Sequence, residues 1–240
     1  MCRTCGCNDP HHHHDHVHAP EAGLPVPILQ ANDAAAARVR GRIARAGVVA
    51  LNVVGAPGAG KTALLETTIA RLPRDVRAGV IVADLATDND ARRLRRDGVP
   101  VLAIETGTGC HLTAPQLERE LERFPLAEVD LLFVENVGNL VCPALFDLGE
   151  EAKVLLVSTA EGTDKPEKYP VIVRHSSLLL FTKLDLLPHV DFDVALATTL
   201  ARRVHPEIEV LSLSARTGEG LGSWIDWIGR RCAATRNRHA

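Results

Sequence analysis

The sequence predicts a doubly wound α/β domain with a mainly parallel sheet, and three observations support this fold class. From residue 32 onward, apolar runs rich in β-branched residues alternate with stretches of helical periodicity. The apolar runs are continuous, as is typical of parallel strands that helices cover on both faces. A glycine-rich turn joins the first apolar run to the helix that follows it.

Each expected element follows from its local pattern. An Ala-rich helix begins at a cap provided by Asn32 or Asp33 and ends near Gly47. The β-branched runs predict strands at residues 48–54, 79–84, 100–104, 130–135, 153–158, 178–182 and 208–213. The remaining stretches predict helices at residues 61–72, 90–97, 114–124, 165–174, 193–204 and 220–232. The sequence has no internal repeat, so these elements are assigned to one domain at residues 30–240.

Composition excludes several classes of protein. The chain has 240 residues, with 27 Lys and Arg against 30 Asp and Glu, and its formal net charge of −3 argues against a strongly basic nucleic-acid binder. No apolar run approaches the roughly 18 residues of a membrane span, and no apolar stretch of a secretory signal follows the N-terminus. We therefore expect a cytoplasmic protein that binds neither nucleic acid nor membrane.

Residues 1–29 lack apolar periodicity and contain four prolines, which predicts a disordered arm that ends in a Pro-rich linker. The arm carries a cluster of cysteines and histidines, which in a cytosolic chain is more typical of metal binding than of disulfides. Asp15 and Val17 interrupt the histidine run, which favours a native metal-buffering tract over an expression tag. The candidate metal ligands of the arm are Cys2, Cys5, Cys7, His11, His12, His13, His14, His16 and His18.

Residues 55–62 fit the phosphate-binding pattern G-x-x-x-x-G-K-[ST] completely, between an expected strand and an expected helix. The glycines let backbone N–H groups converge on phosphate oxygens, and the helix N-terminus adds positive partial charge. Lys61 is expected to reach the β- and γ-phosphates, and Thr62 to ligate Mg²⁺. The expected phosphate contacts are Gly55, Gly58, Ala59, Gly60, Lys61 and Thr62. The chain is therefore predicted to bind a nucleotide.

Two further elements favour GTP over ATP and so predict a P-loop G domain. Thr182, Lys183 and Asp185 belong to a T-K-x-D sequence directly after an expected strand, which resembles the guanine-reading element of G domains. The Asp185 carboxylate would accept hydrogen bonds from guanine, whereas adenine offers no matching pair of donors. A second base-contacting loop is expected after the next strand, at Ser214, Ala215 and Arg216.

Acidic residues at strand ends are candidates for Mg²⁺ binding and hydrolysis. Glu135 ends an expected strand and is followed by Gly138, whose N–H would meet the γ-phosphate. Asp84 ends another strand and is a second candidate Mg²⁺ ligand, and Asp88 lies in the candidate switch segment after it. Capping or solvation is the alternative role for these acids, which with Lys61 are the candidate catalytic residues. We expect slow intrinsic hydrolysis, because the sequence shows no evident water-orienting glutamine and no evident arginine finger.

Cys110, His111 and Cys142 offer a second candidate metal site. Thiolate and imidazole ligands suit Zn²⁺ or Ni²⁺ rather than Mg²⁺. Taken alone, such residues are more often part of a core. Both of their loops follow strands of one parallel sheet, however, and so can converge beside the nucleotide. Three protein ligands leave a four-coordinate site incomplete, so a water or a second copy of the chain would complete it.

At this point the chain resembles the hydrogenase nickel-incorporation GTPases, the HypB family of the SIMIBI class of P-loop GTPases. The resemblance extends from about residue 30 to the C-terminus and includes, besides the P-loop, segments at residues 105–112, 135–143 and 164–170. The C-x-x-C-G-C sequence at residues 2–7 also matches a nickel motif found in some members of this family.

The resemblance implies a GTP-hydrolysing metallochaperone that delivers Ni²⁺ to the active site of [NiFe]-hydrogenase. It implies a tight Ni²⁺ site at Cys2, Cys5 and Cys7, to which the histidine tract would add weak Ni²⁺ sites. It also implies a weaker Zn²⁺ or Ni²⁺ site at Cys110, His111 and Cys142, near a homodimer interface that depends on GTP. The implied partners are a HypA-like nickel/zinc accessory protein and the hydrogenase large subunit.

Three other interpretations fit the sequence less well. A urease-type nickel chaperone GTPase characteristically has a Cys-Pro-His metal loop, whereas here the loop reads Cys110, His111, Leu112. A nickel storage protein would leave the phosphate, Mg²⁺ and base elements without a purpose, and a signalling GTPase would leave the metal cysteines unexplained. Cys232 matches no motif and is expected to pack in the core. A solvated helix face, rather than a partner contact, is expected for Arg92, Arg93, Arg95 and Arg96.

Overall fold

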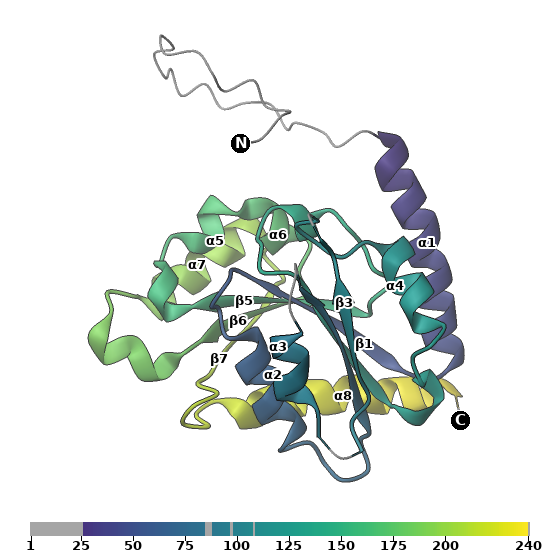
Figure 1. The fold of residues 1–240 in the computed structure, drawn as a ribbon. Helices are drawn as coiled ribbons and strands as arrows, with labels where there is room; N and C mark the ends of the chain where they lie inside the picture. Colours follow the sequence, from purple (N-terminus) through teal and green to yellow (C-terminus); the bar gives the residue numbers. More distant parts are fainter. Residues whose placement is uncertain (1–25, 85–87, 97, 108, 240) are drawn as a thin grey trace.

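The computed structural model describes residues 26–84, 88–96, 98–107 and 109–239. Within these ranges seven parallel strands form one sheet in the order β3-β2-β4-β1-β5-β6-β7 (Figure 1). The strands are β1 (Val49–Gly55), β2 (Ala78–Asp84), β3 (Val101–Glu105), β4 (Leu131–Glu135), β5 (Ala152–Ser158), β6 (Leu178–Thr182) and β7 (Glu209–Ser212). Every strand end lies within one residue of its predicted position, and the predicted α/β fold class is confirmed.

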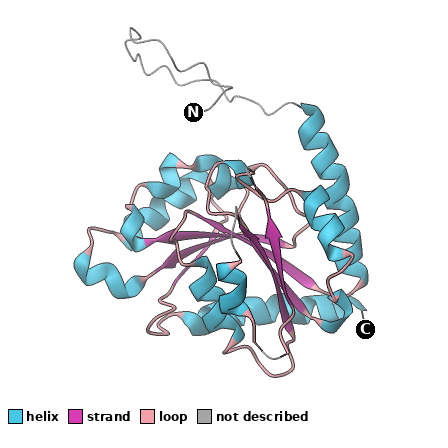
Figure 2. Ribbon diagram, in the orientation of Figure 1, coloured by secondary structure: helices cyan, strands magenta, loops and turns pink. Residues whose placement is uncertain are grey.

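Helices cover both faces of the sheet and give three layers (Figure 2). Strand side chains alternate between the faces, so that Leu51 and Val53 of β1 belong to one core and Ala50 to the core on the other face. The first core is covered by α2 (Lys61–Ile69), α3 (Asn89–Leu94) and α8 (Leu221–His239). The opposite face is covered by α1 (Val26–Arg45), α4 (Ala114–Leu121), α6 (Pro170–Arg174) and α7 (Val194–Val204), with α5 (Lys165–Lys168) beside α7.

Short 3₁₀ turns complete the connections that the structure describes. They are η1 (Leu126–Glu128), η2 (Cys142–Ala144), η3 (Thr159–Glu161) and η4 (Leu184–His189). Among the described helices, none is both long enough and apolar enough to cross a lipid bilayer.

The first helix begins earlier than the sequence predicts. Helix α1 starts at Val26, so Asn32 lies inside it and is buried, and the predicted cap at Asn32 or Asp33 is wrong. Proline is tolerated in the first turn of a helix, so Pro27 does not prevent the earlier start. The Asn32 amide makes tertiary hydrogen bonds instead: its Nδ2 donates to the Asp147 carbonyl at 2.7 Å, and its Oδ1 accepts from the Ala114 N–H at 2.9 Å.

Proline also explains a second difference. The helix predicted at residues 165–174 is divided at Tyr169 into α5 and α6, because Pro170 offers no backbone N–H and restricts the residue before it. Three predicted helices end early in the structure, at Ile69, Leu94 and Leu121. The last helix runs on to His239 instead of ending at residue 232.

Helix α8 is held against the sheet by two buried tryptophans. The rings of Trp224 and Trp227 stack with centroids 5.4 Å apart, and the Trp224 Nε1–H donates to Thr68 Oγ1 at 2.8 Å. Cys232 lies in the same core, where burial raises its thiol pKa to about 11. The expectation that Cys232 packs in the core is confirmed.

Two glycines provide a stability test of the contact between α1 and the loop before β5. Gly149 has a φ of +82°, and an added Cβ would lie 2.5 Å from the Ala36 carbonyl oxygen and 2.7 Å from the Arg40 nitrogen. We expect Gly149→Ala to lower the free energy of unfolding by about 1–3 kcal/mol. The matched variant is Gly222→Ala in α8, where an added Cβ meets nothing within 4 Å, and it should stabilise by about 0.5–1 kcal/mol. Chemical denaturation measures both, and equal effects would contradict the prediction.

Candidate functional site

All seven strands point in one direction, so the loops that follow them meet at one edge of the sheet. Strand β1 lies between β4 and β5, where the chain order changes direction. Ligands of open parallel sheets bind at such a switch point, outside the carboxyl ends of the strands. The P-loop leaves β1 at this point, with the loops after β2, β4 and β6 around it.

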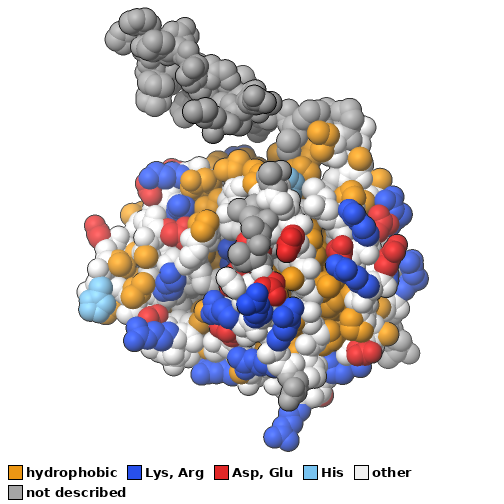
Figure 3. Space-filling view, viewed as in Figure 1, with side chains coloured by type: hydrophobic (Ala, Val, Ile, Leu, Met, Phe, Trp, Pro, Cys, Tyr) orange, Lys and Arg blue, Asp and Glu red, His pale blue; other side chains and the backbone are white. Residues whose placement is uncertain are grey.

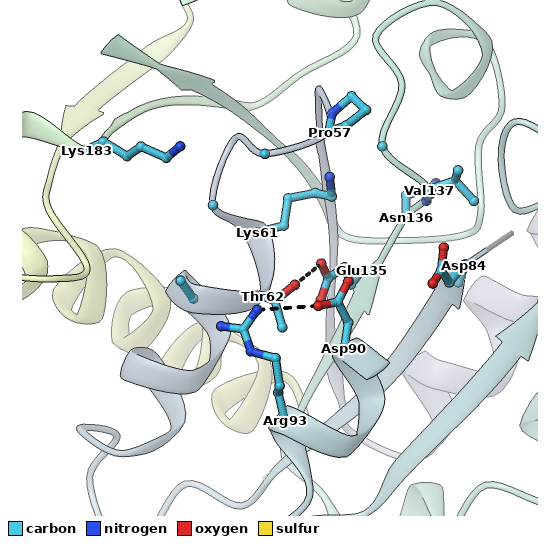
Figure 4. Close-up of a pocket in the computed structure, with 15 residues that line it drawn as sticks. Pro57, Lys61, Thr62, Asp84, Asp90, Arg93, Glu135, Asn136, Val137 and Lys183 are labelled. Carbon is cyan, nitrogen blue, oxygen red and sulfur yellow. Dashed lines mark hydrogen bonds and ion pairs between the residues drawn. The ribbon is translucent and has the colours of Figure 1, made fainter. Parts of the chain in front are cut away.

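A cavity of about 460 Å³ lies at this edge (Figure 4). The Lys61 Nζ donates to the carbonyl oxygens of Gly55 and Ala56 at 3.2 Å each, and burial lowers its pKa. Gly60 has a φ of +94°, a conformation that side chains rarely adopt, where the loop turns into α2. The amine therefore rests on the loop itself, within the cavity that phosphate groups would fill. The lining residues include Pro57, Gly58, Gly60, Lys61, Thr62, Asp84, Glu135, Gly138 and Lys183.

Thr62 and Glu135 fit a Mg²⁺ site by the chemistry of their oxygen atoms. The Thr62 hydroxyl donates to Glu135 Oε1 at 2.7 Å, and Glu135 Oε2 is buried without a hydrogen-bond partner in the described structure. Burial raises the pKa of Glu135 to about 7, although the Thr62 hydrogen bond and the Lys61 charge oppose that shift. A hydroxyl and a carboxylate are the hard oxygen ligands that Mg²⁺ takes in nucleotide sites.

The two other candidate acids lie in different surroundings. Asp84 lines the cavity, and its carbonyl oxygen accepts from the Thr106 N–H at 2.8 Å. Asp88 is not among the described residues that line the cavity. Its carboxylate pairs with Arg92 at 2.5 Å and with Arg95 at 3.7 Å, and the Arg92 hydrogen bond lowers its pKa. Asp88 therefore acts in the described structure as a partner of the basic cluster.

Sequence reasoning missed Asp90 and Arg93, which line the cavity from α3 (Figure 4). The guanidinium of Arg93 lies 2.6 Å from Glu66 Oε2 and 3.4 Å from Asp90 Oδ1. Figure 3 shows basic side chains gathered over α3. Arg92 lies on α3 and is exposed, as expected of a solvated helix face, whereas Arg95 and Arg96 are exposed but follow the end of α3 at Leu94. Arg93 differs because it also reaches the cavity, and the spacing of four arginines in five positions could not single it out.

The elements predicted to read the base come together beside the P-loop. Asp185 Oδ1 accepts from the Ser214 hydroxyl at 2.6 Å, and its other oxygen lies 3.8 Å from the Arg216 guanidinium. The Thr182 hydroxyl donates to the Ala59 carbonyl of the P-loop at 2.7 Å. A second cavity of about 280 Å³ is lined by Gly60, Thr182, Lys183, Asp185, Ala215 and Arg216. Gly60 and Lys183 line both cavities, so one nucleotide can extend from the phosphate end to the base end.

The second candidate metal site is also brought together. The ligand atoms of Cys110, His111 and Cys142 all lie within 4.8 Å of one another. His111 Nε2 is buried without a hydrogen-bond partner in the described structure, and burial lowers the His111 pKa, which favours the neutral ring that ligates metals. The two cysteines are joined as a disulfide, with Cα atoms 6.3 Å apart. The sequence did not predict this pairing, and a metal would require the reduced thiolates.

The remaining predicted ligands lie outside the described residues. These are Cys2, Cys5, Cys7, His11, His12, His13, His14, His16 and His18, and their metal binding stays a prediction of the sequence.

Comparison with known proteins supports one family. The CobW/HypB/UreG nucleotide-binding domain model matches residues 49–212. The hydrogenase maturation factor HypB of Azotobacter vinelandii is 52% identical over 204 residues, which cover 85% of this chain and 67% of that protein. The chain belongs to the HypB family. The resemblance that the sequence motifs indicate is therefore confirmed.

Other members of the HypB family support the same assignment. HypB of Escherichia coli K12 is 46% identical over 211 residues, which cover 88% of this chain and 73% of that protein. The crystal structure of HypB from Archaeoglobus fulgidus has a TM-score of 0.79 at 37% identity, over 85% of this chain and 99% of that one. The crystal structure of HypB from Helicobacter pylori in complex with nickel has a TM-score of 0.80 at 32% identity, over 85% of this chain and 96% of that one.

The buried Glu135 carboxyl predicts that Mg²⁺ binding depends on pH. With its pKa at about 7, this group is mostly protonated below pH 7, and Mg²⁺ binds the ionised form. We expect the apparent Mg²⁺ Kd to rise by up to about tenfold for each pH unit below 7 and to level off above it. Mg²⁺ titration of the GDP-bound protein across this range measures the profile. Glu135→Gln should bind Mg²⁺ weakly at every pH, and a flat wild-type profile would contradict the prediction.

The disulfide predicts that the metal cluster binds metal only after reduction. We expect the oxidised protein to bind no Zn²⁺ at Cys110, His111 and Cys142, and a reductant to restore one site per chain. Zn²⁺ titration with and without reductant measures this in a chain whose arm cysteines are changed to alanine. Cys232→Ser is the matched control and should leave the titration unchanged. Equal binding by both forms would show that these sulfur atoms are not ligands.

Proposed function

We propose that this chain is a GTP-hydrolysing nickel metallochaperone that delivers Ni²⁺ to [NiFe]-hydrogenase during maturation, with GTP switching its dimerisation and metal affinity. Members of its family are named hydrogenase maturation factors, and the Helicobacter pylori HypB structure is described as a complex with nickel. In this proposal Mg²⁺ and GTP occupy the cavities at the edge of the sheet, and Ni²⁺ is the cargo.

One short segment carries the proposal. Glu135, at the candidate Mg²⁺ site, is only seven residues from Cys142 in the metal cluster. Between them, Gly138 lies against the P-loop so closely that an added Cβ would be 3.0 Å from Pro57. Asn139 then donates to the Cys110 carbonyl at 3.4 Å. A nucleotide that moves this segment would therefore act on both loops that carry the metal cluster.

The surface beside the metal cluster supports a homodimer. Val141 and Leu145 flank Cys142 and are 65% and 41% exposed, and both are large apolar side chains. The cluster holds three ligands where Zn²⁺ prefers four. A second copy of the chain would cover the apolar side chains and supply the missing ligands, so GTP-dependent dimerisation would alter the cluster directly.

The proposal also covers the rate of hydrolysis, the role of the arm and the partner proteins. Slow hydrolysis fits the pairing of Arg93 with Glu66 and Asp90, because a guanidinium held by two acids is not free to act as an arginine finger. A tight Ni²⁺ site at the arm cysteines would hold the metal before transfer. The HypA-like accessory protein and the hydrogenase large subunit are the proposed donor or recipient partners, and a cytoplasmic location stays a prediction of the sequence.

Nickel titration tests the proposal. The intact chain and a Cys2→Ala/Cys5→Ala/Cys7→Ala variant are titrated with Ni²⁺ in the presence of GDP or a non-hydrolysable GTP analogue. We expect the variant to lose the tightest site and to keep a weaker site whose affinity depends on the nucleotide, by on the order of 5–150-fold. Affinities that are indifferent to nucleotide at both sites would favour nickel storage instead.

A control separates nucleotide binding from metal binding. Lys61→Ala removes the phosphate-binding amine and leaves every proposed metal ligand in place. It should bind Ni²⁺ with one affinity in both nucleotide conditions, and it should fail to restore nickel delivery to hydrogenase in cells. Full delivery by this variant would contradict a GTP-driven chaperone.

A further inference from the structure

Four buried polar side chains are not among the candidate ligands described above, and their hydrogen bonds reach both the residue after Glu135 and the loops of the metal cluster. They are Asn52, Asn136, Glu150 and Lys153, which are 8% exposed or less. Burial of polar groups is costly unless they are hydrogen-bonded. The partners of these four side chains form a continuous route.

The first of these hydrogen bonds lies beside the nucleotide cavity. Asn136 directly follows Glu135, the candidate Mg²⁺ ligand, and lines the nucleotide cavity. Its Oδ1 accepts from the Leu112 N–H at 3.0 Å, and Leu112 is the residue after His111. A single side chain therefore connects the end of β4 to the loop that carries two of the three metal-cluster residues.

The nitrogen of the same amide connects Asn136 to the neighbouring strand β1. Asn136 Nδ2 donates to Asn52 Oδ1 at 3.3 Å, and Asn52 Nδ2 donates to Glu150 Oε1 at 3.0 Å. Asn52 is fully buried in β1, where its cross-strand neighbours are Val134 of β4 and Lys153 of β5. A leucine or valine at this position would remove one hydrogen-bond partner each from the Glu150 carboxylate and the Asn136 amide, and leaving buried polar groups unpaired is costly.

The route ends on the second metal loop. The Lys153 Nζ lies 3.8 Å from Glu150 Oε1 and donates to the carbonyl oxygens of Pro143 at 2.9 Å, Ala144 at 3.3 Å and Phe146 at 3.2 Å. The first of these carbonyls belongs to the residue after Cys142. The buried ammonium thus fixes the backbone that positions the third ligand.

We propose that Asn136 and Asn52 are positioning residues that make the geometry of the metal cluster depend on the nucleotide. Movement of the segment after Glu135 displaces the Asn136 amide, which shifts the His111 loop directly and the Cys142 loop through Asn52, Glu150 and Lys153. Metal sites tolerate ligand displacements of only about 0.2 Å, so a small shift changes affinity. The inference rests on the proposed function and names the route through which its two sites are coupled.

Ni²⁺ titrations of full-length chains test the route, all with the arm cysteines changed to alanine. The measured quantity is the ratio of Ni²⁺ Kd with GDP to Ni²⁺ Kd with a non-hydrolysable GTP analogue, both nucleotides being saturating. Asn136→Ala and Asn52→Ser should bring this ratio to within about twofold of one, from on the order of 5–150-fold in the parent. Neither variant leaves a buried charge unpaired, as truncation of Glu150 or Lys153 would.

Asn32→Ala is the matched control. This buried amide also bonds the segments that follow both metal loops, at Ala114 and Asp147, and neither of these hydrogen bonds involves β4. Its loss should weaken Ni²⁺ binding by a similar factor in both nucleotide states and leave the ratio unchanged. Because coupling of equilibrium affinities is reciprocal, the effect of Ni²⁺ on GTP-analogue affinity should fall by the same factor in the two route variants.

The outcomes separate the route from the function it serves. A coupled parent whose folded Asn136→Ala and Asn52→Ser variants keep the full ratio overturns the route but leaves the proposed function standing. A parent with a ratio of one overturns the coupling in the proposed function, and the route with it. Should Asn136→Ala fail to fold, as judged by circular dichroism, Asn52→Ser decides alone, because it interrupts the same route without touching the nucleotide cavity.

Discussion

The shared direction of the strands obliges the loops that follow them to meet at one edge of the sheet. That constraint joins residues that are far apart in the sequence, such as Lys61, Glu135 and Asp185, into one cavity system. It also places the loops after β3 and β4, with Cys110 and Cys142, side by side. A mixed sheet would send alternate loops to the opposite edge, and the metal cluster would then lie a strand length away from the nucleotide.

Polar groups of the nucleotide site are paired with one another or with the backbone of the P-loop. Lys61 rests on carbonyl oxygens of its own loop, Glu135 accepts from Thr62, and Asp185 accepts from Ser214. Buried charges without partners would be costly, so these contacts stabilise the folded site. A nucleotide with Mg²⁺ then exchanges one set of polar contacts for another.

Much of this site could be predicted from the sequence because its motifs are local. The P-loop, the T-K-x-D element and the acid at the end of β4 each occupy a few consecutive residues with fixed neighbours. The seven strands were predictable for a related reason, since continuous apolar runs have few alternatives to burial in a parallel sheet. Helix ends were harder, because the start of α1 and the break at Tyr169 depend on how single prolines are accommodated.

What the sequence could not supply is contact between distant polar residues. Asn52 is a single amide in an apolar strand, and only the fold reveals that it meets Asn136 and Glu150. Arg93 is one of several similar arginines until α3 turns it toward the cavity. The pairing of Cys110 with Cys142 likewise depends on two loops converging in space. The sequence does show that Asn52 is a polar residue inside an apolar run, but it does not indicate which residues Asn52 contacts.

In the proposed function, the buried polar route would give a physical reason for the direction of metal transfer. Coupling between two sites is mutual, so whichever nucleotide favours metal binding is itself favoured by the bound metal. In that proposal, hydrolysis would break this symmetry, because it would replace one nucleotide by the other while the metal is still bound. The cluster is then left with a geometry suited to a different nucleotide state, and its metal is held less tightly than before. A slow GTPase fits this scheme better than a fast one, since hydrolysis must wait until the metal and its recipient are both in place.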